Sequence, residues 1–356
     1  MENGMSKIDN LRLALTFDDV QISPRYSEIE TRSQCDVGSR ITMKKCIRIP
    51  LVASPMDTVC GKEMALRMFQ LGGIGIVHRF QSISDQISCR TPDACDDIQG
   101  FYPRAAAIGV KGDYFERATE LIKVGGYNII LIDVASGDNI NVKRVLLQLK
   151  SEFSGVEFMA GNVADREGAR DLCEWGADSL RVGLGNGSLC TTRLKTGVGV
   201  PQITALDDCI EVANQYDVPV VADGGIRYPG DVAKALALGA STVMLGSLLA
   251  GTKESPGKIE KVGKWPNEKL FKKYRGAASL ETKMVHNLEE KNVEGESKPI
   301  PYKGKVERII NDILDGVRSS MSYVGAGNLS EFEIRSRFMR VTKAGQIEAQ
   351  PHLLES

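Results

Sequence analysis

The sequence predicts an α/β protein in which eight parallel strands close into a barrel, and three observations lead to this fold. Short, continuous apolar runs of the kind that form buried parallel strands recur eight times. Amphipathic helical stretches separate most of them, and several of these helices stop at a glycine just before the next strand. Eight such units in about 200 residues fit a (β/α)8 barrel better than an open sheet. A doubly wound sheet is the alternative, although no G-x-G-x-x-G motif opens a helix at the required place.

The strand-like runs cover residues 49–54, 73–78, 105–110, 128–135, 157–163, 179–185, 218–225 and 241–247. The helical pattern is clearest in residues 113–124, where the apolar side chains fall on one side: Phe115, Ala118, Leu121 and Ile122. Four glycines are expected to end helices in the left-handed conformation: Gly72, Gly125, Gly176 and Gly239. Pro229 suits the first turn of the helix that ends at Gly239. The unit over residues 88–104 lacks a clear helical stripe.

Residues 251–304 change in character, because they are charged, rich in Lys, Glu and Gly, and without long periodicity. A connection of this length predicts a flap over the barrel mouth, although a solvated surface excursion would have the same composition. The chain then returns to a helix at 306–317. Residues 1–10 are polar and are expected to be flexible, and residues 1–356 together are predicted to form a single barrel domain.

Composition argues against several classes of partner. The formal charge is −1 and runs of Lys or Arg are absent, so neither nucleic acid nor an anionic membrane is expected as a partner. No apolar segment approaches the roughly 20 residues of a membrane helix, and the first residues lack a signal-peptide core. The eight cysteines include no C-x-x-C pair, so we expect neither zinc nor a disulfide framework, and a reducing cytoplasmic location.

A barrel also predicts where its chemistry gathers: at the carboxyl ends of the strands, with phosphate held after strands seven and eight. Polar or glycine-rich groups stand at nearly all of these ends, namely 54–57, His78, Asp133, Asn162, the 183–190 loop, 223–225 and 246–247. The last two segments offer backbone donors suited to a phosphate monoester. Each alone could be an ordinary turn, and only their joint placement on one face indicates a site.

Cys190 is the candidate nucleophile of this site. It follows an apolar run and lies in a loop with glycines at 183, 185 and 187 and hydroxyl side chains at 188, 191 and 192. Glycines let backbone amides approach a ligand closely, and these amides together with Arg193 would draw the thiol toward thiolate. The alternative is a buried cysteine that acts as a small hydrophobe, which is the commoner fate of a lone cysteine.

These residues resemble those of the IMP dehydrogenase/GMP reductase family over nearly the whole chain, from Leu15 to Thr342. The matching blocks are PMDTV (55–59), GGIG (72–75), AGNV (160–163), SLCTTR (188–193), GVGVPQ (197–202), ADGG (222–225), MLG (244–246) and PYKG (301–304). The resemblance implies a TIM barrel, a purine mononucleotide substrate, a nicotinamide cofactor and a homotetramer.

The resemblance also implies roles for individual residues. Cys190 would attack C2 of the purine, with Thr192 and Glu294 handling protons. Substrate contacts are implied for Ser54, Met56, Ser188, Asp223, Gly225, Gly246, Ser247, Tyr274 and Gly276. Cofactor contacts are implied for Asp133 and Asn162, whereas His78 either lines the cofactor groove or only packs, and His286 and His352 are expected at the surface. The backbone carbonyls of Gly183, Gly185 and Cys190 would ligate a monovalent cation, potassium.

Within the family, the features point in both directions. The CBS insertion that most dehydrogenases carry is absent, and the short segment 277–293 lacks the Arg-Tyr pair with which dehydrogenases activate water. Both features are closer to GMP reductases. Blocks at 75–78, 224–228 and 274–276 are closer to dehydrogenases, and Ala277-Ala278 replaces the Met-Gly or Met-Ser pair that normally contacts the base.

The sequence therefore predicts a GMP reductase that converts GMP to IMP and ammonia through a covalent Cys190–purine intermediate, with NADPH as cofactor and NADH or NAD left open. One alternative is an IMP dehydrogenase without CBS domains, which would oxidise IMP with NAD and water to XMP. The other is a catalytically silent barrel that binds purine nucleotides.

Overall fold

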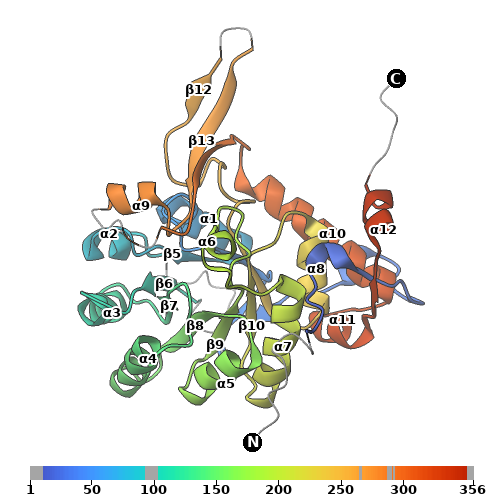
Figure 1. The fold of residues 1–356 in the computed structure, drawn as a ribbon, viewed down its shortest axis with the longest axis horizontal. Coiled ribbons are helices and arrows are strands. Elements are labelled where there is room, and N and C mark those ends of the chain that lie inside the picture. Colours follow the sequence, from blue (N-terminus) through green and yellow to red (C-terminus); the bar gives the residue numbers. More distant parts are fainter. Residues whose placement is uncertain (1–10, 93–102, 264–266, 287–290, 292, 351–356) are drawn as a thin grey trace, which may run out of the picture.

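Eight parallel strands form a closed barrel in the computed structural model, which describes residues 11–92, 103–263, 267–286, 291 and 293–350 (Figure 1). The barrel strands are β4 (Leu51–Ala53), β5 (Ile74–Val77), β6 (Ala105–Ile108), β7 (Ile129–Asp133), β8 (Glu157–Val163), β9 (Ser179–Val182), β10 (Val220–Asp223) and β11 (Thr242–Leu245). Each strand pairs in parallel with the next, and β11 pairs with β4 to close the ring. The predicted (β/α)8 barrel and its eight strands are confirmed.

Helices wrap the outside of the barrel. They are α1 (Lys62–Leu71), α2 (Ile83–Ser88), α3 (Tyr114–Lys123), α4 (Ile140–Glu152), α5 (Arg166–Glu174), α7 (Gln202–Gln215), α8 (Pro229–Ala237) and α10 (Val306–Val324), with the short α6 (Thr192–Thr196) before α7. Side chains fix several starts: Ser82, Asn139 and Asp165 accept backbone N–H bonds at the first turns of α2, α4 and α5. Part of the 88–104 stretch, residues 93–102, lies outside the described residues.

Glycines end three of these helices as predicted, and one prediction was wrong by a residue. Gly72, Gly176 and Gly239 have φ of 90°, 91° and 112°. After α3, however, the left-handed residue is Gly126, with φ of 65°, and not Gly125. The reason is that the Gly125 N–H still bonds the carbonyl of Glu120, so the chain leaves the helix one residue later.

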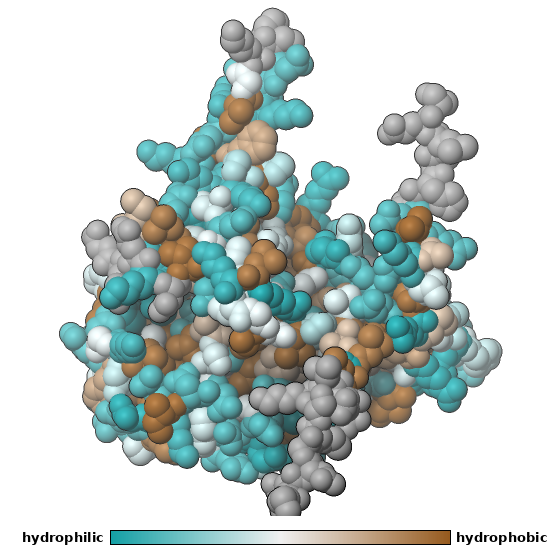
Figure 2. Space-filling model, in the orientation of Figure 1, coloured by the Kyte–Doolittle hydropathy of each residue, from teal (hydrophilic) through white to brown (hydrophobic). Residues whose placement is uncertain are grey.

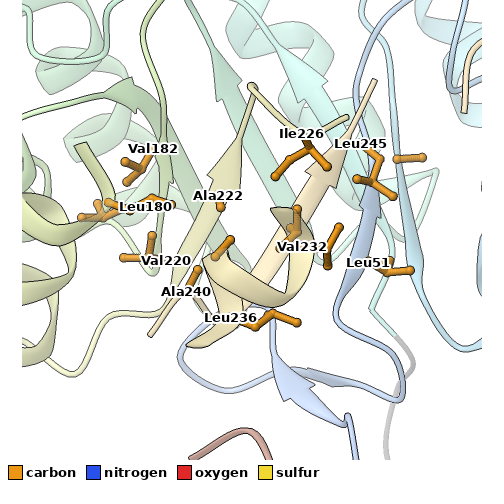
Figure 3. Close-up of a cluster of buried hydrophobic side chains, with 14 of the residues drawn as sticks. Leu51, Leu180, Val182, Val220, Ala222, Ile226, Val232, Leu236, Ala240 and Leu245 are labelled. Carbon is orange, nitrogen blue, oxygen red and sulfur yellow. The ribbon is translucent and has the colours of Figure 1, made fainter. Parts of the chain in front are cut away.

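The strands are buried on both faces, which explains their continuous apolar sequences. Inside the barrel, Val52, Ile76, Leu131, Met159 and Met244 belong to one cluster, which also includes Ile41 and Ile47 from the hairpin of β2 (Ser39–Arg40) and β3 (Cys46–Ile47). Outside the barrel, a larger cluster fills the space between strands and helices. Figure 3 shows Val232 and Leu236 of α8 packed beside β10 and β11.

After β11 the chain forms the predicted flap, and it contains regular structure. β12 (Glu260–Val262), β13 (Lys269–Arg275) and β14 (Ser297–Pro301) make an antiparallel sheet, and α9 (Leu280–Val285) lies between β13 and β14 in sequence. The β12–β13 arm projects away from the barrel (Figure 1), and its surface is mostly hydrophilic (Figure 2). The helix predicted at 306–317 is α10, which extends to Val324.

The segments at the two ends of the chain pack together beside α8. β1 (Val20–Ile22), which follows the 3-10 helix η1 (Phe17–Asp19), pairs antiparallel with β15 (Phe338–Arg340). A second 3-10 helix, η2 (Arg32–Gln34), contacts α10, and α11 (Leu329–Arg335) and α12 (Lys343–Glu348) flank β15. Among the described residues, none of the helices combines the length and apolar character needed to span a membrane.

Candidate active site

A cavity of about 660 Å³ opens at the carboxyl ends of the barrel strands, under the flap. Its size is typical of a small-molecule site. With the exception of His78, every residue predicted for the site lines it: Ser54, Met56, Asp133, Asn162, Gly183, Gly185, Ser188, Cys190, Thr192, Asp223, Gly225, Gly246, Ser247, Tyr274, Gly276 and Glu294. The barrel therefore brings together residues that are up to 240 positions apart in sequence, Ser54 and Glu294 being the extremes.

A chain of hydrogen bonds connects the candidate nucleophile to a carboxylate. The Cys190 thiol donates to Thr192 Oγ1 at 3.1 Å, and the Thr192 hydroxyl donates to Glu294 Oε2 at 2.7 Å. The flap holds the last member in place, because the Thr191 N–H donates to the Glu294 carbonyl and Gly295 forms an isolated bridge with Cys190. A proton can therefore pass between the sulfur and the carboxylate through one hydroxyl group.

Cys190 is half buried at the cavity wall, unlike most other cysteines of the chain. Burial raises the pKa of Cys173 to about 12, so that thiol stays protonated and packs as a small hydrophobe. The structure thus does not support the buried alternative for Cys190. Arg193 was predicted to draw the Cys190 thiol toward thiolate. In the structure its guanidinium donates to the Val200 carbonyl, and burial lowers the pKa of this arginine.

The loop before Cys190 requires glycine at a point of close approach. Gly183 has φ of 144°, and a Cβ at this position would lie 1.9 Å from the carbonyl oxygen of Asp223. No other residue fits there without moving β10 away from β9. This approach brings the Cys190 loop beside the end of β10.

Tyr274 and Ser188 close the end of the cavity that contains the loop after β11. The Tyr274 hydroxyl lies 3.2 Å from Ser188 Oγ, and a Cβ built on Gly246 would meet the same hydroxyl at 3.1 Å. Burial raises the pKa of Tyr274, so its hydroxyl remains a donor. Together with the backbone of Gly246 and Ser247, these hydroxyls offer the donors that a phosphate requires.

Arg181 is a site residue that the motif analysis missed. It is 8% exposed, and it bridges two carboxylates: its Nη1 donates to Asp133 at 2.5 Å and its Nε to Asp223 at 2.9 Å. Asn162 completes the group, since its amide donates to Asp223 at 2.8 Å and to the Gly183 carbonyl at 2.7 Å. Burial alone would lower the pKa of Arg181, but the two carboxylates outweigh burial and raise it. A charged residue inside the apolar run 179–182 was the available signal.

His78 is buried at 7% exposure and does not line the cavity. Its Nδ1 accepts the Phe80 N–H at 3.1 Å, and burial lowers its pKa to about 4, so the ring is neutral. Its neighbours Arg79 and Phe80 line the cavity instead, and Arg79 Nε is a buried nitrogen without a hydrogen bond. The packing interpretation of His78 therefore describes its position better than the cofactor one.

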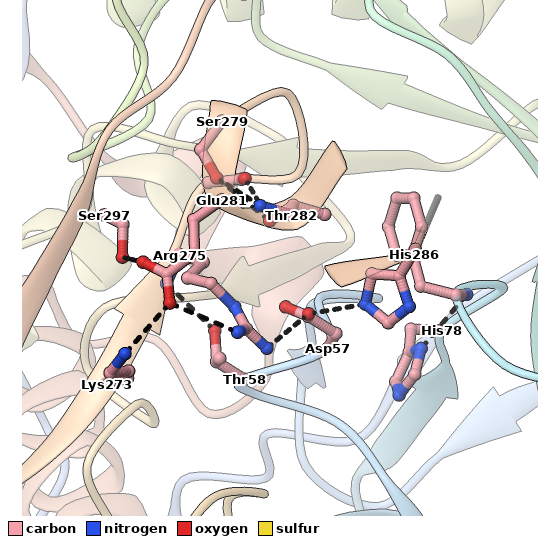
Figure 4. A network of polar contacts seen from close by, with 12 residues as sticks. Asp57, Thr58, His78, Lys273, Arg275, Ser279, Glu281, Thr282, His286 and Ser297 are labelled. Atoms are coloured by element: carbon pink, nitrogen blue, oxygen red, sulfur yellow. Dashed lines mark hydrogen bonds and ion pairs between the residues drawn. The ribbon is translucent and has the colours of Figure 1, made fainter. Parts of the chain in front are cut away.

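The flap is fastened to the barrel by a polar network that sequence reasoning did not find (Figure 4). Asp57, whose side chain is 4% exposed, accepts from Arg275 Nη2 at 2.7 Å and pairs with His286 Nε2 at 2.9 Å. The His286 ring also stacks on Phe80, with ring centroids 5.4 Å apart. His286 was expected at the surface, and its side chain is 22% exposed, but the fold also brings it to Asp57 across 229 positions in sequence. His352 lies outside the described residues.

The residues predicted to hold a cation would offer backbone carbonyls. The Gly183 carbonyl accepts the Asn162 amide and keeps one lone pair, and Gly185, with φ of 79°, turns the loop near it. Carbonyl oxygens suit a monovalent cation such as potassium. Within the described residues, no group of three or more His, Cys, Asp or Glu side chains could hold a metal ion.

Comparisons with known proteins agree with this geometry. The model of the IMP dehydrogenase / GMP reductase domain matches residues 14–352. The chain is 36% identical to the inosine-5'-monophosphate dehydrogenase of Cryptosporidium parvum, over 97% of this chain and 96% of the relative. It is 43% identical to that of Helicobacter pylori, over 96% and 97%. The structure of GMP reductase from Trypanosoma brucei in complex with guanosine 5'-monophosphate superposes with a TM-score of 0.89 at 28% identity, over 98% of this chain and all of that one. The chain belongs to the IMP dehydrogenase/GMP reductase family.

Proposed function

We propose that this member of a family of purine-nucleotide oxidoreductases is a GMP reductase, which converts GMP to IMP and ammonia. The observation that carries the proposal is the Cys190–Thr192–Glu294 relay under a flap whose segment 277–293 contains neither Arg nor Tyr. Without a pair that activates water, a covalent purine adduct has time to be reduced. The T. brucei GMP reductase, a structure of similar fold with GMP bound, supports the purine nucleotide as ligand.

The cavity suggests how GMP is oriented. Its phosphate would meet Ser188, Tyr274, Gly225 and the 246–247 backbone, and its ribose hydroxyls would meet Asp223, with Ser54, Met56 and Gly276 lining the walls. Because Asn162 and Arg181 both donate to the Asp223 carboxylate, that carboxylate is held in one orientation before the ribose arrives. In this orientation the base would lie near Cys190, Ala277 and Ala278, which line the same cavity.

The relay can perform both proton transfers that deamination requires. As Cys190 sulfur forms its bond to C2 of guanine, the thiol proton moves through the Thr192 hydroxyl to Glu294. As the C2–N bond breaks, the same proton returns along the relay to the departing amino group, which leaves as ammonia. One carboxylate thus acts as base and then as acid. The thiol proton leaves with the ammonia, so a proton from solvent would restore the thiol when the sulfur is released from C2.

The residues present fit a nicotinamide cofactor beside this base. Asp133, Arg79 and Phe80 line the cavity. The buried Nε of Arg79 has no hydrogen bond and meets Asp133 only as an ion pair at 3.7 Å, so a bound polar group would satisfy it. When bound, NADPH supplies the hydride to C2. Arg181 holds Asp133 from below, so the cofactor's ribose would meet a carboxylate of fixed orientation. Potassium on the carbonyls of Gly183, Gly185 and Cys190 would make the catalytic loop more rigid. The proposal also includes NADPH in preference to NADH.

A homotetramer and a cytoplasmic location also belong to this proposal. Leu194 is 87% exposed on the short helix after Cys190, and Val198 beside it is exposed as well. Large apolar side chains at such a place are typical of a surface that a second copy covers. Sedimentation of the purified protein would test this assembly.

A second candidate is IMP dehydrogenase, which is favoured by relatives of that name at up to 43% identity. One spectrophotometric comparison separates the two activities, and we expect the nicotinamide absorbance to fall with GMP and NADPH. A rise with IMP and NAD instead would refute the reductase and support the dehydrogenase. If neither mixture changes although GMP binds, the protein is a silent nucleotide-binding barrel.

A further inference from the structure

Lys303 lies just after β14, and its ammonium group contacts the loop that follows β11. Its Nζ donates to the carbonyl oxygen of Ser247 at 2.5 Å and to that of Leu248 at 3.2 Å. Backbone bonds fix the same junction, because the Lys303 N–H donates to the Gly251 carbonyl and the Lys253 N–H to the Gly304 carbonyl. The ammonium therefore has a defined place on the far side of the turn that begins at Gly246.

This cation has no anion beside it. Within the described part of the chain no carboxylate pairs with Lys303, and burial alone lowers its pKa to about 8. A partly buried charge that is held only by neutral carbonyls is unfavourable compared with the same charge in water. An anion bound on the other side of the turn would supply the missing counter-charge.

The turn itself can transmit the charge. The Ser247 carbonyl belongs to the same peptide group as the Leu248 N–H, and the Leu248 carbonyl to the same group as the Leu249 N–H, which in turn bonds the Gly246 carbonyl at 3.1 Å. A cation on a carbonyl oxygen polarises its peptide group and strengthens the N–H as a donor. Gly246 and Ser247, which begin this turn, line the cavity, so a phosphate bound there would meet the same turn that carries the ammonium on its later carbonyls.

We propose that Lys303 is a positioning residue for the nucleotide phosphate: its ammonium braces and polarises the turn that receives the phosphate, and phosphate binding in turn favours the protonated lysine. This proposal rests on the proposed function only in placing a phosphate at Gly246 and Ser247. It also makes the end of the flap sheet sensitive to whether the phosphate loop is filled.

Lys272 provides a matched control in the neighbouring strand. It is 4% exposed, and its Nζ also donates to two backbone carbonyls, those of Ser255 at 2.6 Å and Lys253 at 3.3 Å. The difference is that these carbonyls lie beyond the 246–250 turn and that the charges of Glu254 and Glu63 act on Lys272. If buried lysines matter only for holding the flap sheet, the two should behave alike.

The experiment is calorimetric titration of the whole protein with GMP and with IMP at pH 8, in two buffers of different ionisation enthalpy. The wild type should take up roughly half a proton per site on binding, since a lysine with a pKa near 8 becomes fully charged. Lys303→Arg, whose charge does not titrate, should bind GMP but lose that uptake. Lys303→Met should bind GMP roughly ten- to a hundredfold more weakly, whereas Lys272→Met should keep wild-type affinity and uptake.

Equal proton uptake by wild type and Lys303→Arg overturns the proposal, and so does unchanged GMP affinity in Lys303→Met. Loss of affinity in Lys272→Met equal to that in Lys303→Met would also overturn it, because the effect would then be structural. Should Lys303→Met fail to fold, the comparison of wild type with Lys303→Arg decides alone. If neither nucleotide binds to the wild type, the proposed function and this proposal both fail. If GMP binds but proton uptake does not depend on Lys303, only this proposal fails.

Discussion

Cys190 differs from the other cysteines of the chain in what surrounds its sulfur. Cys60, Cys173 and Cys209 lie in apolar surroundings that raise the pKa of each thiol. Cys190 instead faces a cavity and donates to a hydroxyl that is itself bonded to a carboxylate. Of these thiols, only that of Cys190 donates to a side chain that is itself bonded to a carboxylate, whereas the Cys209 thiol donates to the backbone carbonyl of Asp165.

Replacement of Cys190 by alanine should remove turnover and leave nucleotide binding. We expect kcat to fall by at least roughly a thousandfold, because the covalent step has no substitute nucleophile. GMP affinity, measured by calorimetry, should stay within a few-fold of wild type. Cys46→Ala serves as the control because Cys46 is exposed and far from the cavity. Substantial residual activity in Cys190→Ala would show that the chemistry does not pass through this sulfur.

Arg181→Leu should destabilise the protein by about 3–5 kcal/mol, because it leaves the carboxylates of Asp133 and Asp223 partly buried and without their shared cation. Urea unfolding measures this change. The control is Arg40→Leu, which removes an exposed pair with Asp217 and should cost less than about 1 kcal/mol. Similar losses for the two variants would contradict the role given to Arg181.

Sequence reasoning located the residues that stand at strand ends and missed those defined by long-range contacts. Asp223 and Gly246 could be predicted because each stands at the carboxyl end of a recognisable strand. The pairing of His286 with Asp57 could not, because it depends on where the flap returns to the barrel, and no local pattern encodes that. Arg181 is an intermediate case. An arginine inside an apolar strand can be recognised in the sequence, but its two carboxylate partners cannot.

At the scale of elements, the flap shows why some strands escape sequence analysis. In β13 the inward positions are Lys272 and Tyr274, whereas Leu270 is exposed. All three lie on one face of the strand, where a buried lysine follows an exposed leucine, so the strand shows no recognisable alternation of apolar and polar residues. The buried polar groups have structural partners, because Lys272 bonds backbone carbonyls and Tyr274 bonds Ser188 in the site.

The fastening of the flap at Asp57 should control catalysis without touching the substrate. In Asp57→Ala the bonds to Arg275 and His286 are lost, so Glu294 should spend less time at Thr192. We expect kcat to fall roughly tenfold or more, GMP affinity to change little, and amides of 277–286 to exchange hydrogen faster.

Lys273→Ala is the control for this change, because it removes only an exposed contact between the same sheet and Glu281. It should leave both kcat and hydrogen exchange close to wild type. Unaltered kcat in Asp57→Ala would mean that the flap is positioned by its strands alone.

At the scale of the whole molecule, the barrel was predictable because its strands are covered on both faces and therefore read as continuous apolar runs. That the sheet closes into a barrel could be predicted from the number of strand–helix units, and no single unit indicates it. The same burial creates a pH limit to stability, since His78 is enclosed as a neutral ring next to β5.

The pKa of His78 is lowered to about 4 in the folded state, below its value of roughly 6.5 in an unfolded chain. Above pH 6.5 neither state binds the proton, so the full stability is present. As the pH falls from 6.5 to 4, only the unfolded state takes up the proton, and stability should fall by about 3 kcal/mol. Urea unfolding at several pH values tests this, and His78→Gln should lack that part of the decline. Parallel curves for the two proteins would contradict it.

The pairing of β13 with β14 has a consequence for how this enzyme could change its reaction. Arg275 lies opposite Ser297, so the chain leaves the sheet and re-enters it at adjacent positions. Whatever is inserted between them begins and ends at the same point in space, and each doubling of its length costs only about 0.6 kcal/mol of closure entropy. The segment between Arg275 and Ser297 is therefore an exchangeable cassette. If the proposed reductase activity holds, grafting a longer cassette that brings its own water-activating pair should redirect the adduct from reduction to hydrolysis while the barrel stays as it is.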